Sequence, residues 1–68
     1  MYEATKRDGI STMPEKAFNE NRDNLVAELK DLFKEQVHQD LVVVEDFDAT
    51  VTFTTPGKLD EYVEYAIK

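Results

Sequence analysis

Apolar residues recur at helical spacing through the first half of the chain. They form one stripe with a period close to 3.6 residues, made by Phe18, Leu25, Leu29, Leu32 and Phe33. The segment Thr12-Met13-Pro14-Glu15 before it has the form of a helix start, with a capping Thr and a Pro in the first turn. The pattern predicts a helix from near Met13 to Gln36. Because the run 19–24 is rich in Asn, which competes for backbone hydrogen bonds, the helix is expected either to pass through it or to restart near Asp23.

The hydrophobic period changes to that of strands between residues 41 and 54. Leu41-Val42-Val43-Val44 is apolar at every position, and residues 47–54 then alternate apolar side chains with Asp or Thr. Glu45-Asp46 separates the two runs. We therefore predict an antiparallel hairpin, with one long bent strand as the alternative.

The last segment returns to helical spacing. Thr55-Pro56-Gly57 is typical of the end of a strand, and the apolar residues that follow are spaced i, i+3, i+4, i+7 and i+8, namely Leu59, Tyr62, Val63, Ala66 and Ile67. This spacing predicts a final helix.

At the other end, Asp8-Gly9 favours a turn, so residues 1–11 are expected to be either an edge strand or a frayed tail. The predicted fold is α+β, a small single domain over residues 1–68 with the order (β)αββα. In it, two helices pack on one face of an antiparallel sheet.

Length and charge exclude several classes of function. The 68 residues suit one small domain, and 15 acidic against 8 basic residues give a net charge of −7. A direct binder of nucleic acid or of an anionic membrane needs the opposite sign. The chain has no Cys, and its longest aliphatic run has four residues where a membrane span needs about 20, so we expect a soluble cytoplasmic protein.

Candidate catalytic chemistry is sparse. His38 is the one His and Ser11 the one Ser, and Ser11 does not sit in a Gly-x-Ser-x-Gly motif. The densest carboxylate run, Glu45-Asp46-Phe47-Asp48, lacks the Gly and Glu spacing of a calcium loop. We therefore predict no catalytic residue, no metal site and no cofactor, and a protein that is not an enzyme.

The acidity is concentrated in the second half of the chain. Residues 35–68 carry a net charge of −6 and residues 1–34 a net charge of −1. Carboxylates along a strand or a helix are spaced by about 5 to 7 Å, comparable with successive phosphates of a nucleic-acid strand. The candidate partner-binding acids are Asp46, Asp48, Asp60, Glu61, Glu64, Glu45 and Asp40.

The partner that such a surface fits is a basic protein, in particular one that binds nucleic acid and is blocked by charge mimicry of DNA. In size and charge the chain resembles the small acidic DNA-mimic inhibitors of bacteriophages, a resemblance of overall properties that no motif carries. The alternative interpretation is that the acids only keep the protein in solution.

The apolar run Leu41-Val42-Val43-Val44 suggests a second kind of contact. A strand that is apolar on both faces needs a cover on each. Either the first predicted helix covers one face and a second subunit the other, or the strand is central and is wrapped by the N-terminal segment. Because a chain of this size has a small core, we predict a homodimer through these four residues. The alternative function is then a small structural or assembly subunit that interacts through strand 41–44.

Overall fold

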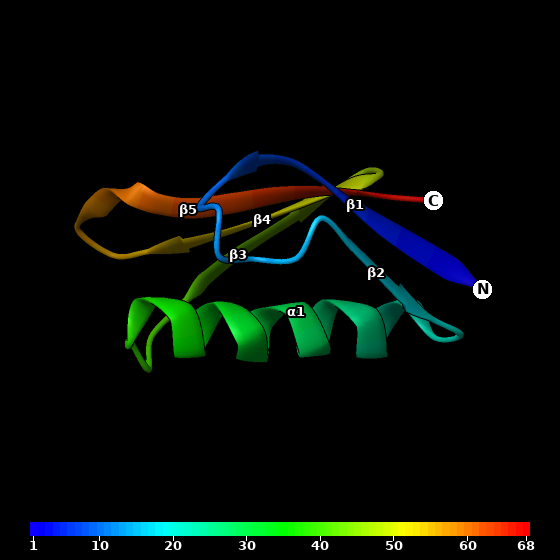
Figure 1. The fold of residues 1–68 in the computed structure, drawn as a ribbon, viewed down its shortest axis with the longest axis horizontal. Helices are drawn as coiled ribbons and strands as arrows, with labels where there is room; N and C mark the ends of the chain where they lie inside the picture. Colours follow the sequence, from blue (N-terminus) through cyan, green and yellow to red (C-terminus); the bar gives the residue numbers. More distant parts are fainter.

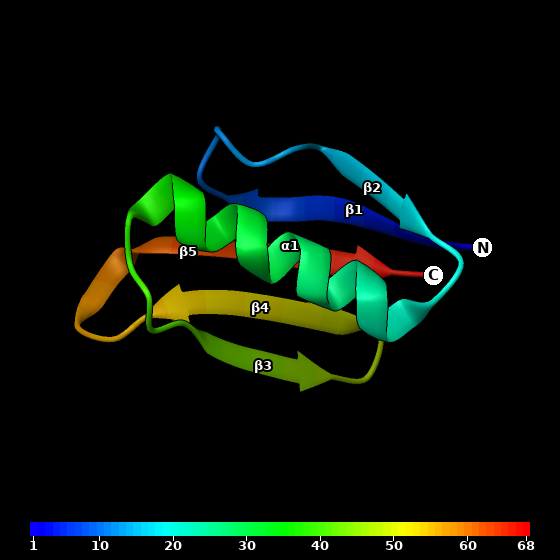
Figure 2. The ribbon, with the colours of Figure 1, turned by 90° about the horizontal axis from the view of Figure 1, so that it is seen from below.

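The computed structural model describes residues 1–57 and 61–68 with their side chains. Six elements follow one another along the chain: β1 (Tyr2–Gly9), β2 (Lys16–Asn19), α1 (Arg22–Val37), β3 (Val43–Phe47), β4 (Thr50–Thr55) and β5 (Lys58–Ile67). The strands form one antiparallel sheet in the order β2-β1-β5-β4-β3. Helix α1 lies across one face of this sheet (Figures 1 and 2).

The predicted final helix is wrong, because this segment is strand β5 at the centre of the sheet. Val63, Tyr65 and Ile67 are buried and the residues between them are less so, which is the two-residue period of a strand. Apolar side chains at 62, 63, 65, 66 and 67 satisfy both periods, and pairing with β1 on one side and β4 on the other decides for a strand. Leu59, the first position of the predicted stripe, lies outside the described residues.

The predicted start of the first helix near Met13 is also wrong. Strand β2 ends at Asn19, in the Asn-rich run. The Asn21 side chain then caps α1 by accepting a hydrogen bond from the Asn24 N–H at 3.1 Å. The helix therefore begins at Arg22, close to the alternative restart. Residues 16–19 form strand β2 instead, so a single helix covers the sheet in the part of the chain that the structure describes.

The hairpin of β3 and β4 is antiparallel, as the hydrophobic pattern predicted, but its turn lies elsewhere. Glu45 and Asp46 are inside β3, and the chain reverses at Asp48-Ala49 between the paired residues Phe47 and Thr50. Asp48 adopts a positive φ of 60°, a conformation that Asp tolerates better than most residues. The N-terminal segment forms β1, which pairs with β2 and with β5 and so lies inside the sheet.

The hydrophobic core lies between α1 and the sheet. Leu25, Leu29 and Phe33 of the helix are fully buried, and the ring of Phe33 stands 6.0 Å from that of Phe53 in β4. The opposite face of the sheet carries half-buried residues such as Thr52, and no described helix covers it.

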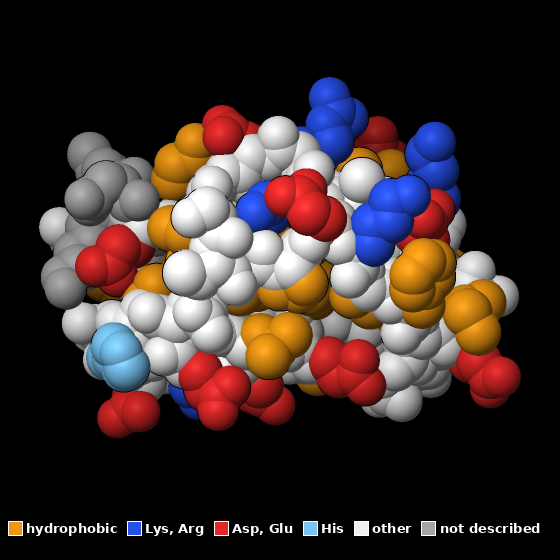
Figure 3. Space-filling view, viewed as in Figure 1, with side chains coloured by type: hydrophobic (Ala, Val, Ile, Leu, Met, Phe, Trp, Pro, Cys, Tyr) orange, Lys and Arg blue, Asp and Glu red, His pale blue; other side chains and the backbone are white. Residues whose placement is uncertain are grey.

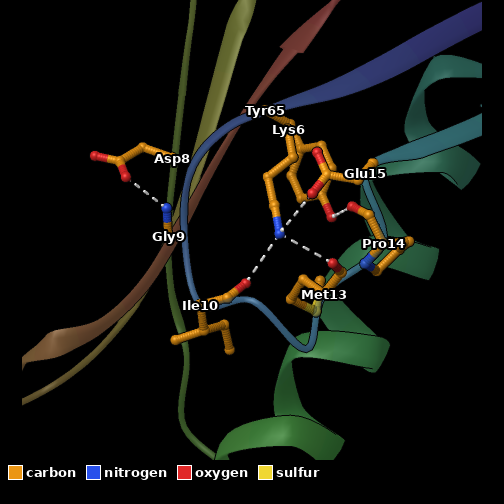
Figure 4. A network of polar contacts seen from close by, with 8 residues as sticks. All are labelled: Lys6, Asp8, Gly9, Ile10, Met13, Pro14, Glu15 and Tyr65. Carbon is orange, nitrogen blue, oxygen red and sulfur yellow. Dashed lines mark hydrogen bonds and ion pairs between the residues drawn. The ribbon is translucent and has the colours of Figure 1, made fainter.

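Two buried polar side chains hold the connection between β1 and β2 (Figure 4). Lys6, whose side chain is 9% exposed, donates to the carbonyl oxygens of Ile10 and Met13 at 3.2 Å each and pairs with the Glu15 carboxylate at 3.4 Å. The Tyr65 hydroxyl donates to the Pro14 carbonyl at 2.6 Å. These bonds hold the connection so that the Met13 side chain is buried in the core.

Gly9 is required where β1 passes β5. Its φ is +121°, and a Cβ there would collide with the Tyr62 carbonyl oxygen and lie 2.5 Å from the Val63 Cα. We expect Gly9→Ala to destabilise the fold by about 2 to 5 kcal/mol, measured by urea unfolding. Gly57→Ala is the control, because it also places Ala at a positive φ but in open space, and should cost about 1 to 2 kcal/mol. Equal costs for the two variants would contradict the close approach.

Burial raises the pKa of Tyr65 to about 12. An unfolded Tyr ionises near pH 10, so this group stabilises the fold fully below about pH 10 and its contribution is lost as the pH rises toward 12. We expect Tyr65→Phe to reduce stability by about 1 to 3 kcal/mol at pH 7, because the Pro14 carbonyl loses its donor. The same variant should flatten the alkaline loss in urea midpoints. An unchanged slope, or an equal effect of Tyr2→Phe at an exposed site, would contradict this account.

Candidate interaction surface

Strand β3 is a free edge of the sheet and has apolar side chains in solvent. Val43 is 42% exposed and Phe47 is 83% exposed, and Leu41 just before the strand is 68% exposed. Val42 and Val44 are half-buried and pack against the core. The side chains of the predicted interface residues 41–44 thus alternate in their surroundings. Those of Leu41 and Val43 are exposed to solvent, and those of Val42 and Val44 pack against the core between α1 and the sheet.

The backbone of the β3 edge has polar groups that face away from the sheet. The Ile67 N–H donates to the Ala49 carbonyl at 2.8 Å. The backbone groups of Ala49 therefore point toward β5. Because the N–H and C=O groups of successive residues in a strand point to opposite neighbours, those of Thr50, Thr52 and Thr54 in β4 point toward β3. Their partners in β3 are Val43, Glu45 and Phe47. The N–H and C=O groups of Val44 and Asp46 therefore point outward from the edge.

The predicted acids of β3 lie on opposite faces. Asp46, on the helix side, accepts two hydrogen bonds from Arg22 at the start of α1, with Nη1 at 2.8 Å from Oδ2 and Nη2 at 2.9 Å from Oδ1. This bidentate contact lowers the pKa of Asp46 and raises the pKa of Arg22. Glu45 shares the helix-free face with Val43 and Phe47. Asp48 is in the turn, so it does not continue a row with Asp46 along the strand.

The remaining predicted acids are spread over the molecule. Asp40 is exposed in the connection from α1 to β3. Glu64 of β5 shares the helix-free face with Glu45, with Thr52 of β4 paired to both of them. Asp60 lies outside the described residues. Segment 40–48 therefore collects four of the predicted acids, and the described members of the set do not form one row.

Asp8 lies opposite Glu64 on the strand that neighbours β5. Its carboxylate accepts a hydrogen bond from the Tyr62 hydroxyl at 2.6 Å and one from the Gly9 N–H at 2.9 Å. Both bonds lower the pKa of Asp8, and the bond from Tyr62 has the larger effect. The hydrogen bond to Asp8 in turn raises the pKa of Tyr62. The Asp8 carboxylate is thus held in place by hydrogen-bond donors next to it.

A surface depression of about 720 Å³ brings Ser11, His38 and Glu61 to one place beside the end of α1. His38 adopts the left-handed conformation, with φ 54°, and its backbone N–H caps the helix by donating to the Lys34 carbonyl. Among the described hydrogen bonds, none joins the side chains of Ser11 and His38, so a nucleophile paired with its base is not formed there. No group of three potential metal ligands occurs among the described residues.

Sequence reasoning missed an acidic flank on α1. Glu28, Asp31 and Glu35 surround the exposed Leu32 and line a hollow of about 440 Å³. They lie at spacing i, i+3 and i+7 and so share one side of the helix. Figure 3 shows several acidic side chains along the lower margin, which α1 forms, with one basic side chain partly visible among them; most of the visible Lys and Arg lie in the upper part of this view, together with further acids.

In the sequence, Lys16 and Glu20 at i, i+4 and Asp31 and Lys34 at i, i+3 predict ion pairs that would neutralise the outer face of the helix. Lys16 belongs to β2 and pairs with Glu3 at 3.4 Å, not with Glu20. The ion pairs among the described residues do not include Asp31 with Lys34. The helical spacing of Glu28, Asp31 and Glu35 was the feature of the sequence from which this flank could have been predicted. Fewer ion pairs neutralise these acids than the sequence predicted.

No protein-family model, no curated protein and no solved structure matches this chain. In the described part of the chain, none of the helices combines the length and the apolar composition needed to cross a bilayer. The candidate function therefore rests on the chain's own surface.

The Arg22–Asp46 pair should give the fold an acid-sensitive term. Because Asp46 has a lowered pKa in the fold, its contribution is present above about pH 4 and is lost as the pH falls through its folded-state pKa. We expect Asp46→Asn to cost about 0.5 to 1 kcal/mol at pH 7 and less at pH 3, measured by urea unfolding at both values. Asp48→Asn makes the same charge change in the turn and is the control. An equal, pH-independent loss in both variants would contradict the pair.

Proposed function

We propose that this protein is a non-enzymatic interaction module that binds a basic protein, in particular one that binds nucleic acid, and blocks it by competing with phosphates. The observation that carries the proposal is the position of segment 40–48, which is a free sheet edge bearing both carboxylates and exposed apolar side chains. Two features of the sequence that suggested different contacts, the acids and the apolar run, thus meet on one surface.

The charges support a basic partner. Glu45 lies between Val43 and Phe47 on the strand, and Asp40 and Asp48 are exposed beyond its two ends. The whole chain carries a net charge of −7, which accelerates encounter with a basic surface and weakens encounter with an acidic one. Each exposed ion pair contributes only about 0 to 1 kcal/mol, so the acids act together and the apolar contacts add to them.

A second candidate is a structural or assembly subunit that self-associates through the same strand. The exposure of Leu41, Val43 and Phe47 favours it, because burial of apolar area is the main favourable term in most protein association. The two candidates differ in their response to salt. At about 1 M salt the Debye length falls to about 3 Å, which weakens a charge-driven complex and leaves an apolar homodimer intact.

The proposal is tested by changing charge on one surface at a time. The edge variant combines Asp40→Asn, Glu45→Gln and Asp48→Asn, and its control combines Glu28→Gln, Asp31→Asn and Glu35→Gln on the α1 flank. Each removes the same charge. Basic proteins that the immobilised protein retains at low salt would be purified, and their binding to labelled DNA measured with each variant as competitor.

We expect the edge variant to compete about tenfold less well than the unmodified protein, and the α1 control to compete nearly as well. Salt should relieve the inhibition in every case. Competition that survives the edge changes and disappears in the α1 control would move the binding surface to the helix. A homodimer that persists at about 1 M salt in sedimentation, with no inhibition of DNA binding, would replace the proposal by the assembly candidate.

A further inference from the structure

We propose that strand β3 binds its partner by strand addition, so that an extended basic segment of the partner becomes a sixth strand of the sheet. This inference rests on the proposed function and specifies its contact. The N–H and C=O groups of Val44 and Asp46 face outward, and an added strand would lie about 4.8 Å away and bond to them.

The β3 edge is less protected against a basic strand than against an acidic one. Natural edges are protected by charged side chains, above all Lys, by Pro, by bulges or by shortness. Strand β3 has no Lys, no Pro and no register shift in its pairing with β4, and its charged residues, Glu45 and Asp46, are both acidic, which disfavours an acidic strand and favours a basic one. The opposite edge, β2, has four residues and includes Lys16, so its protection is stronger. Of the two edges, β3 is the one open to an added strand.

The side chains of β3 specify the added segment. On the helix-free face the order along the strand is Val43, Glu45, Phe47, which is apolar, acidic, apolar. Cross-strand neighbours on one face interact directly, so the complementary segment has Lys or Arg opposite Glu45 and apolar residues two positions to either side. Asp46 is held on the other face by Arg22, which fixes the strand without occupying its outer backbone groups.

A second copy of the chain fits this edge less well than a basic segment does. The antiparallel register that pairs Val43 with Phe47 of another copy also places Glu45 opposite Glu45, and like charges directly opposite are destabilising. Both copies carry a net charge of −7, which adds repulsion at longer range. The acids therefore disfavour self-pairing on an edge that is otherwise open.

The test uses a synthetic peptide of about six residues, the length of a typical strand, with blocked ends. One face of it carries Val, Lys and Val at alternate positions, with Thr between them. A matched peptide has Glu in place of Lys. Each is titrated into the isotopically labelled protein, and amide shifts and affinity are measured by NMR.

We expect the Lys peptide to shift the amides of Val44 and Asp46 most strongly and to bind about five- to tenfold more tightly than the Glu peptide. Glu45→Lys should reverse this preference. Val44→Pro should abolish binding, because it removes an outward N–H that does not pair with β4, whereas Val44→Thr, with a similar loss of apolar contact, should still bind. The charge reversal in Glu45→Lys keeps the test valid even if Val44→Pro fails to fold.

Three outcomes would overturn the inference. Equal binding of both peptides would show that charge does not select the occupant. Shifts of the Val44 and Asp46 amides with protein concentration alone would identify a second copy as the occupant. Shifts confined to the α1 flank on adding the Lys peptide would remove strand addition while leaving a basic partner in place, so that failure of this inference is distinct from failure of the proposed function.

Discussion

The structure depends on one constraint, that a single helix must bury one face of a five-stranded sheet. Leu25, Leu29 and Phe33 share one core cluster with the inward side chains of the sheet, and the ring of Phe33 contacts that of Phe53 in β4. Because only one face is covered, strand β4 and the described part of β5 alternate buried with half-buried residues, and the sheet keeps an uncovered face and two free edges. The candidate surface is a consequence of this arrangement.

Polar contacts hold the two ends of the layer in place. At one side, Lys6 and Tyr65 bind backbone carbonyls of the connection between β1 and β2, which brings Met13 into the core. At the other side, the Arg22 guanidinium holds the Asp46 carboxylate and so joins the start of α1 to β3. The second contact has a functional meaning in this account, because it fixes the edge strand while its outer backbone groups remain exposed.

The sequence predicted the parts of the fold that depend on local pattern. The helical stripe over Leu25, Leu29 and Phe33 and the antiparallel hairpin could be predicted. The strand predicted at 41–44 has other bounds in the structure, where it begins at Val43 and runs through Glu45 and Asp46 to Phe47. Strand β5 could not, because its apolar residues fit both periods and only pairing with β1 and β4, which are distant in sequence, decides between them. The positions of Glu45 and Asp46 on opposite faces of the sheet could not be predicted either. The sequence placed the turn of the hairpin at these two residues, whereas the chain turns at Asp48-Ala49 and both acids lie inside β3.

The most direct test of the central claim is amide hydrogen exchange in the free protein, followed by NMR residue by residue. If β3 is an open edge in the register described, the amides of Val44 and Asp46 exchange at nearly unprotected rates, while those of Val43 and Glu45, which bond to β4, are protected. Protection of Val44 and Asp46 equal to that of their neighbours would contradict the account, because the edge would then already be covered or its register would be different.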